Sequence, residues 1–333
     1  MDLDGFVERR RRSWARLDEL ASRRRLSATE ADELVDLYQR ASTDLSTLRS
    51  GAPDPALVSR LSASIARARA AITGAHTSAW TDVGRFFAVS FPAAAYRAGR
   101  WWLVTGVAFT AVVTVVAWWI ASNAEVRNAI ATPEEIAALV NGDFADYYTA
   151  NPAGSFAAQV WTNNAFLAAM VLVLGAMLCL PAVYVLWQNA LNAAAVAGLM
   201  ASAGRLDLFL GLIAPHGLLE LTAVFLAAGA GMRLGWSIIA PGGRPRSVAM
   251  AAEGRGAATI AVGLIVVLLV SGVIEAFVTP SSLPTWARIG IGIAAWVGFL
   301  AYVVVLGGRA VRAGFTGDVT GSGSTTDVAP YAA

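Results

Sequence analysis

The chain has 333 residues, of which 56% are hydrophobic and only 14% are charged, and its formal net charge is +2. Ordinary soluble domains carry about 25% charged residues, so this composition and a mean hydropathy of +0.57 exclude a typical soluble enzyme. They predict an integral, all-α membrane protein. The single cysteine, Cys179, excludes an internal disulfide and a cysteine metal cluster.

Residues 1–78 are predicted to form a soluble, cytoplasmic helical region. All 25 basic residues are arginines, and 16 of them lie in the first 100 positions together with 12 of the 23 acids. Because the acids offset the arginines, we expect no nucleic-acid binding. The sequence SATE at 27–30 is a capping-box pattern that begins a helix.

Apolar residues then recur every three or four positions, as on one face of a helix. The first stripe is Leu34, Leu37, Ala41, Leu45 and Leu48, and the second, after a break at 51–57, is Val58, Leu61, Ile65, Ala68 and Ile72. We expect a helical hairpin packed against a third helix that carries Phe6, Trp14, Leu17 and Leu20. The charged surface of this region is either simply solvated or a surface for a partner.

Residues 79–100 alternate aromatic rings with arginines, in the sequence WTDVGRFFAVSFPAAAYRAGR from Trp80. This pattern predicts an amphipathic helix in the membrane interface, with rings at the acyl boundary and guanidinium groups at lipid phosphates. Pro92 is expected to kink or end it.

Residues 101–312 are predicted to form the transmembrane domain, in contact with the lipid bilayer. Six spans are expected, at 101–120, 165–187, 188–204, 206–232, 258–278 and 286–306. The span at 188–204 is short for the roughly 20 residues that a crossing needs. A re-entrant pair of helices is therefore the alternative interpretation of this segment. Residues 313–333 are low in complexity and are expected to be disordered.

Arginine is concentrated in the N-terminal region, in the loop at 233–257 and after residue 308, which predicts that these parts and both termini are cytoplasmic. The acidic segment 121–160 has Arg127 as its one basic residue and is expected outside the cell membrane. The expected location is a bacterial cytoplasmic (inner) membrane, crossed several times.

Three ionisable residues lie within predicted spans: His216, Glu220 and Glu275. An isolated charge in the bilayer centre costs a few kcal/mol or more, about 2.5–3.5 on insertion scales. His216 and Glu220 share a helix face at i and i+4, and Pro215 beside them removes one backbone hydrogen bond. We expect a polar cluster of these three residues, with Asn163 and Asn164 as further candidates.

Three interpretations of this cluster stay open. It is a structural lock between helices, a proton or ligand site, or a divalent-metal site, zinc first, held by His216, Glu220 and Glu275. The sequence contains no hydrolase signature such as His-Glu-x-x-His, so no catalytic residue is assigned and an enzyme is the less favoured reading.

Small residues at four-residue spacing predict close helix packing in lipid. One stripe is Ala227, Gly231 and Gly235, and another is Gly290, Ala294 and Gly298. We expect packing within the chain, with a homodimer or homo-oligomer as the alternative.

The motifs PHGLLE at 215–220, AGAGMRLG at 228–235 and IEAFVTPSSLP at 274–284 resemble those of the stage II sporulation protein M family. The resemblance covers about residues 80–312 and includes RFFAVSFPAAAYRAGRWW and the pair Asn163–Asn164. It implies a membrane scaffold or anchor for envelope partners that remodel peptidoglycan. The alternative is a transporter or an intramembrane metal-dependent enzyme that uses the His/Glu/Glu cluster.

Overall fold

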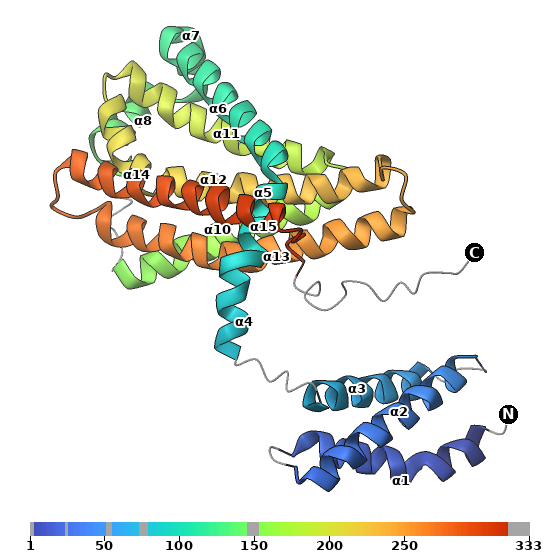
Figure 1. Cartoon of the computed structure of the whole chain (residues 1–333). Coiled ribbons are helices and arrows are strands. Elements are labelled where there is room, and N and C mark those ends of the chain that lie inside the picture. The colour runs from blue at the N-terminus through green and yellow to red at the C-terminus, as the bar shows by residue number, and fades with distance from the viewer. Residues whose placement is uncertain (1–2, 24–25, 51–54, 73–78, 145–152, 319–333) are drawn as a thin grey trace. The chain divides into compact units, whose positions relative to one another are not determined.

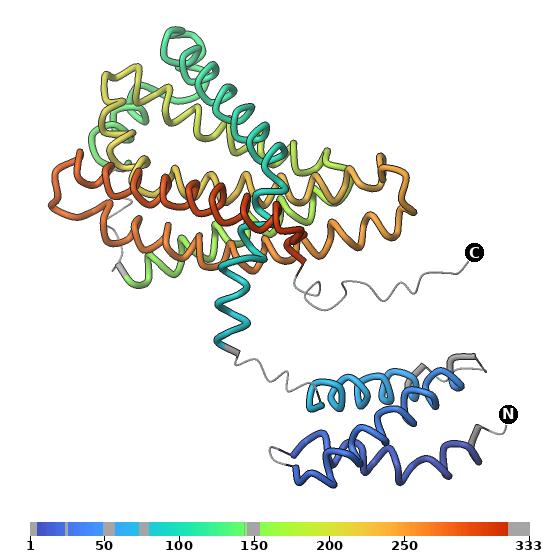
Figure 2. Tube along the Cα trace, in the orientation of Figure 1, coloured from blue at the N-terminus to red at the C-terminus, as the bar shows by residue number. Residues whose placement is uncertain are grey.

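The computed structural model describes residues 3–23, 26–50, 55–72, 79–144 and 153–318. The chain divides into two compact units, residues 1–82 and 83–333 (Figure 1). The regular elements among the described residues are all helical, so the all-α prediction is confirmed. The Cα trace follows the same order of helices (Figure 2).

The first unit contains the helices α1 (Leu3–Ser22), α2 (Ala28–Ser50) and α3 (Pro55–Ile72), each of which contacts the other two. The capping box forms at the start of α2, because Ser27 N donates to Glu30 Oε2 and Glu30 N donates to Ser27 Oγ. The predicted stripes face inward, except that Ile72 at the end of the second stripe is 37% exposed. The buried core is Leu17, Leu20, Leu34, Ala41, Leu48, Leu61 and Ala68.

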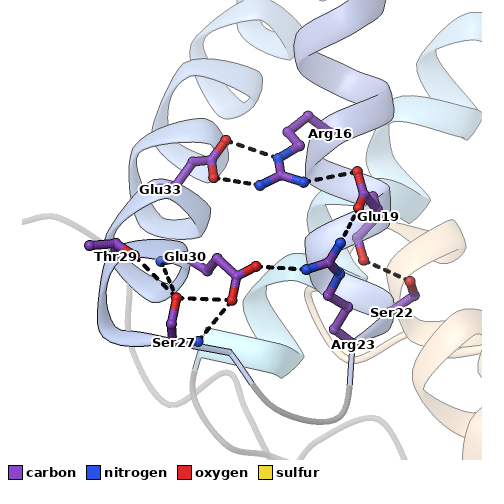
Figure 3. A network of polar contacts seen from close by, with 8 residues as sticks. All are labelled: Arg16, Glu19, Ser22, Arg23, Ser27, Thr29, Glu30 and Glu33. Atoms are coloured by element: carbon purple, nitrogen blue, oxygen red, sulfur yellow. Dashed lines mark hydrogen bonds and ion pairs between the residues drawn. The ribbon is translucent and has the colours of Figure 1, made fainter.

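A network of ion pairs links α1 to the first turns of α2 (Figure 3). Arg16 makes two parallel hydrogen bonds to Glu33, of 3.0 and 2.9 Å, and a third to Glu19. Arg23 pairs with Glu19 and with Glu30. The arginines lower the pKa of Glu33 and Glu19, and hydrogen bonds from Ser27 lower the pKa of Glu30.

One acid lies inside the three-helix unit. Asp44 is 4% exposed. It accepts a hydrogen bond of 3.0 Å from Trp14 Nε1 and lies 3.3 Å from Arg10 Nε. Buried carboxylates need such partners, so this contact fixes how α1 sits on α2.

Among its described residues, the second unit contains six helices long and apolar enough to cross a membrane, which confirms the expected number. Their ranges are α6 (Gly99–Ser122), α10 (Ala153–Ala176), α11 (Leu180–Ser202), α12 (Leu206–Ile239), α13 (Arg246–Val273) continued by the π-helix η3 (Ile274–Val278), and α14 (Thr285–Tyr302) continued by η4 (Val303–Gly307) and α15 (Gly308–Arg312). Helix α12 contacts α6, α10, α11, α13 and α14. It is therefore the common packing partner of the unit (Figure 1).

The second and third spans differ from the expected ranges of 165–187 and 188–204. The apolar run from 165 to 187 is divided by a tight turn, at which Leu178 and Cys179 have φ values of 59° and 71°. The run therefore belongs to two helices, α10 and α11. Helix α11 is continuous over 23 residues, which is long enough to cross and removes the need for a re-entrant pair.

The segment expected in the interface, 79–100, forms α4 (Ala79–Arg85), the π-helix η1 (Phe86–Ser90) and α5 (Phe91–Arg97). Phe91 is 1% exposed and packs near Phe299 and Tyr302, where we expected acyl chains. A Cβ at Gly263 would lie 2.1 Å from Phe91 Cδ2, so only glycine leaves room for the ring there. Pro92 lies in the first turn of α5, where proline is tolerated, and does not end the segment.

Between α6 and α10, the acidic segment forms α7 (Ala124–Ile130), α8 (Pro133–Ala138) and the π-helix η2 (Leu139–Asp143). Asn123 caps α7 through its side chain, and Thr132 with Glu135 forms a capping box on α8. Arg127 donates to the carbonyls of Ile120 and Ala121 at the end of α6. Residues 145–152, and 319–333 of the expected tail, lie outside the described part.

The two small-residue stripes have different environments. Gly231 and Gly235 bring α12 against α10, because Cβ atoms there would lie 2.1 Å from Leu172 O and 2.3 Å from Gly175 O, and Ala227 is buried. Gly290, Ala294 and Gly298 are exposed on α14, and both glycines have open space around them. The glycine of α14 that packs closely is Gly292.

Candidate functional site

The three ionisable residues of the spans lie together. His216 and Glu220 lie on α12, and Glu275 lies in η3 at the end of α13. One donor atom from each residue falls within 4.8 Å of the other two. His216 and Glu275 are buried, with exposed fractions of 4% and 5%, and Glu220 is partly buried.

Hydroxyl groups of the neighbouring helix hold the cluster in place. Thr279 Oγ1 lies 3.3 Å from His216 Nδ1, and Ser271 Oγ donates to the carbonyl oxygen of His216 at 3.2 Å. The same hydroxyl lies 3.5 Å from Glu220 Oε2. A contact at Nδ1 orients an imidazole and directs Nε2 to the other side of the ring. His216 Nε2 faces Glu275 Oε2 at 3.8 Å.

The backbone around Glu275 is unusual for a membrane helix. Thr279 N donates to Ile274 O, an i to i+5 bond that widens the helix by one residue. Such π-turns are frequent at functional sites. Arg288 of α14 secures the following turn by donating to Thr279 O at 2.5 Å and to Thr285 Oγ1 at 3.0 Å.

A close approach of α14 sets the position of α12 beside the histidine. A Cβ at Gly292 would lie 2.2 Å from Pro215 O. One turn further along α14 and two turns further along α12, Trp296 Nε1 donates to Thr222 Oγ1 at 3.0 Å. Helix α12 runs without interruption through Pro215, so the proline is accommodated and does not break the span.

The cluster contains two carboxyl groups and one imidazole, so it can carry more negative than positive charge. Within the described residues, neither Glu220 nor Glu275 pairs with an arginine, and Arg288 turns to backbone and hydroxyl oxygens. Uncompensated carboxylates are costly in a low-dielectric interior. Such carboxylates are stabilised by protonation, by the His216 imidazole when it carries a charge, or by a bound cation.

Two further candidates from the sequence, Asn163 and Asn164, lie on α10. Asn163 is exposed and Asn164 is half-buried on α10, and in the described part of the chain no hydrogen bond joins either to the cluster. Ser271, Thr279 and Arg288 were not predicted from the sequence. The only available signal was the TPSS turn that follows Glu275.

The donor set fits a divalent cation. Imidazole nitrogen and carboxylate oxygen are ordinary ligands of zinc, with bonds of about 2.0–2.2 Å. The three donor atoms lie within 4.8 Å of one another, so a cation placed between them would face all three. Three protein ligands leave one coordination position open, as in catalytic rather than structural zinc sites.

Comparison with protein families agrees with this arrangement of motifs. The family model of stage II sporulation protein M matches residues 106–280, more than half of the chain. The chain belongs to this family. The matched range contains His216, Glu220 and Glu275, together with Ser271 and Thr279.

A second model, a domain of unknown function, matches residues 4–74 and so covers the three-helix unit. Comparison with curated proteins and with solved structures finds no match. The family assignment and the six apolar helices establish a multi-pass membrane protein.

Proposed function

We propose that this protein binds a divalent cation, zinc first, inside its membrane unit, and that His216, Glu220 and Glu275 are the ligands. The observation that carries the proposal is the convergence of these three donors without an arginine partner. A closed structural lock would join its members by hydrogen bonds of 2.7–3.2 Å, whereas the contact between the imidazole and the Glu275 carboxylate is 3.8 Å.

Three protein ligands would leave a fourth coordination position of the cation open, which supports a role as an intramembrane metal-dependent enzyme or a metal transporter. In the enzyme, the cation would polarise a bound water or carbonyl group. This chain's residues would hold the ligands, with Thr279 orienting His216 and Ser271 placed beside Glu220. In the transporter, the same ligands would form the binding step of the pathway.

Metal analysis of the full chain in mild detergent tests this proposal. The wild type is expected to contain about one zinc per chain, while His216→Asn and Glu275→Gln lose it, because each removes one of the three ligands. Glu253→Gln is the matched control, since Glu253 lies on α13 but pairs with Arg233 at 2.8 Å outside the cluster. If the wild type is stripped with a chelator, titrated with zinc and still binds no divalent cation, the proposal is wrong. Protonation of Glu220 and Glu275 would then be the remaining interpretation.

A second measurement on the same preparations distinguishes a transporter from an enzyme. Zinc flux into liposomes that contain the wild type, and its loss in Glu275→Gln, would identify a transporter. Metal binding without flux would direct the search to an enzyme.

A second candidate function is a membrane scaffold or anchor for partners that remodel the peptidoglycan envelope. The observation that favours it is that residues 1–82 form a separate compact unit with a hydrophobic core of their own. Residues 4–74 of this unit also match a separate family model. Copurification in mild detergent at native expression, comparing the full chain with a chain lacking residues 1–78, tests it. Partners that depend on this region support the scaffold, and partner-free protein opposes it.

We further infer that residues 1–82 face the cytoplasm and that the membrane is the inner membrane of a bacterium. Support comes from the arginines at Arg97, Arg100, Arg244 and Arg246, because cytoplasmic loops are enriched in basic residues. In a Cys179→Ser background, Arg244→Cys is expected to resist an impermeant maleimide in intact cells and Ser282→Cys to react. The opposite labelling pattern would mean that the protein has the opposite orientation in the membrane.

A further inference from the structure

An apolar groove lies on the membrane unit between α6, α11 and α12, away from the His/Glu/Glu cluster. Its volume is about 770 Å³, within the range of small-molecule sites. Val104, Ala108 and Val112 line it on α6, and Val183 and Leu186 line it on α11. The groove is open to the lipid side, since Val104 and Val183 are 69% and 50% exposed.

Two arginines lie at one end of this apolar groove. Arg97, at the end of α5, and Arg100, in the first turn of α6, both line it. In the described part of the chain, neither guanidinium makes a hydrogen bond or ion pair with an acid, whereas nearby Arg233 is paired with Glu253 and Arg255 with Asp318. The rings of Trp101 and Trp236, 6.0 Å apart, lie beside the arginines as interfacial residues do.

The electrostatic environment of Arg97 favours an anion. Partial burial and the positive charges of Arg233 and Arg244 lower the pKa of Arg97, and the nearby carboxylate of Glu253 offsets this only in part. A negative group placed here would relieve that repulsion. Guanidinium groups bind phosphate oxygens through two parallel hydrogen bonds.

The length of the groove matches one leaflet. From Trp101 to Val112 the axis of α6 rises about 16 Å at 1.5 Å per residue. Half of a bilayer's hydrocarbon core is about 15 Å. An acyl chain that begins at the arginines would thus lie along the apolar wall to the middle of the membrane.

We propose that this groove binds one anionic phospholipid, with its phosphate at Arg97 and Arg100 and an acyl chain along Val104, Ala108 and Val112. The lipid would cover the exposed side of α6 and α11 and offset part of the positive charge of the two arginines. The site is independent of the proposed cation site, so either can fail without the other.

Native mass spectrometry of the full chain tests the proposal. The detergent-purified protein is incubated with phosphatidylglycerol and phosphatidylcholine of identical acyl chains. The wild type should retain one phosphatidylglycerol with a preference of about tenfold, or about 1.4 kcal/mol. Arg97→Gln/Arg100→Gln should abolish this preference. Arg309→Gln/Arg312→Gln, which removes the same charge from α15 outside the groove, should keep it.

A variant that fills the groove tests the acyl chain separately. Ala108→Trp keeps both arginines and should lose the retained lipid. Unchanged phosphatidylglycerol binding in Ala108→Trp, equal retention of the two lipids, or equal losses in the two arginine double variants would overturn the proposal. A dimer mass that Ala108→Trp converts to monomer would assign the groove to a second copy of the chain and also overturn it.

Discussion

Gly292 of α14 lies directly against Pro215 of α12, at a distance that leaves no room for a Cβ atom between the two helices. Pro215 precedes His216 in the chain, so the spacing of these helices determines where the imidazole lies. The contact ties the packing of α14, which contributes no ligand, to the geometry of the polar cluster.

Replacing this glycine should therefore disturb both stability and the cluster. Gly292→Val is expected to cost about 1–3 kcal/mol of stability or more through overpacking, and to reduce bound metal. Gly290→Val is the matched control on the same helix, because nothing lies within 4 Å of a Cβ there. Thermal unfolding in detergent and metal content are the measurements. Equal effects of the two variants would show that the close approach does not matter.

The turn between α10 and α11 contains a residue in an unfavourable conformation. Leu178 has a φ of 59° and is 51% exposed. A non-glycine residue in this left-handed region costs about 1–2 kcal/mol, and glycine avoids that cost. Leu178→Gly should raise the melting temperature, whereas Met177→Gly, at a neighbouring exposed position with ordinary φ, should lower it. A decrease for both would refute the interpretation.

The ion-pair network of α1 and α2 should make the first unit sensitive to acid. The pKa values of Glu19, Glu30 and Glu33 are lowered from 4.5 in the folded state. Their stabilisation is therefore complete above the unfolded pKa and is lost as the pH falls below about 4.5 and through the folded values. The urea midpoint of residues 1–82, followed by circular dichroism, should drop between pH 6 and pH 3.5.

Two arginine variants isolate the contribution of the network. Arg16→Gln removes contacts with Glu19 and Glu33 and should reduce the pH-dependent drop. Arg40→Gln removes only an exposed pair with Asp36 within α2 and should retain the full drop. A drop of the same size in all three proteins would mean that other carboxyl groups cause it.

The buried acid of the first unit should matter far more than an exposed one. Asp44→Ala leaves Trp14 Nε1 without its acceptor and should cost about 1.5–3 kcal/mol, the range for hydrogen bonds to charged groups. Asp36→Ala, on the exposed side of the same helix, should cost well below 1 kcal/mol. Urea unfolding of residues 1–82 measures both, and similar values would argue against a structural role of Asp44.

Much of the fold could be predicted from the sequence because its signals are local. The capping box at Ser27 and the stripes led by Leu34 and Leu61 require only helix geometry and a polar solvent on the other side. The number of spans follows from apolar length. The boundaries of α10 and α11 do not, since the turn at Leu178 and Cys179 is as apolar as the helices it separates.

The candidate site could likewise be predicted only in part from the sequence. The spacing of His216 and Glu220 alone places them on one helix face. The cost of a charge inside the membrane indicates that Glu275 has polar partners. Thr279 and Ser271 could not be predicted, because a helix that is apolar all round does not reveal which face meets which neighbour. For the same reason the stripe at Gly290, Ala294 and Gly298 did not predict that Gly292 makes the contact.

The burial of Phe91 has a mechanical consequence. The ring is enclosed by α13 and α14, and the neighbouring η1 turn is fastened by a hydrogen bond from Tyr302 to the carbonyl of Phe87. The segment at 86–97, near the start of the second unit, is thus held inside the helix bundle. A displacement of η1 or α5 would therefore strain α13, the helix that continues to Glu275.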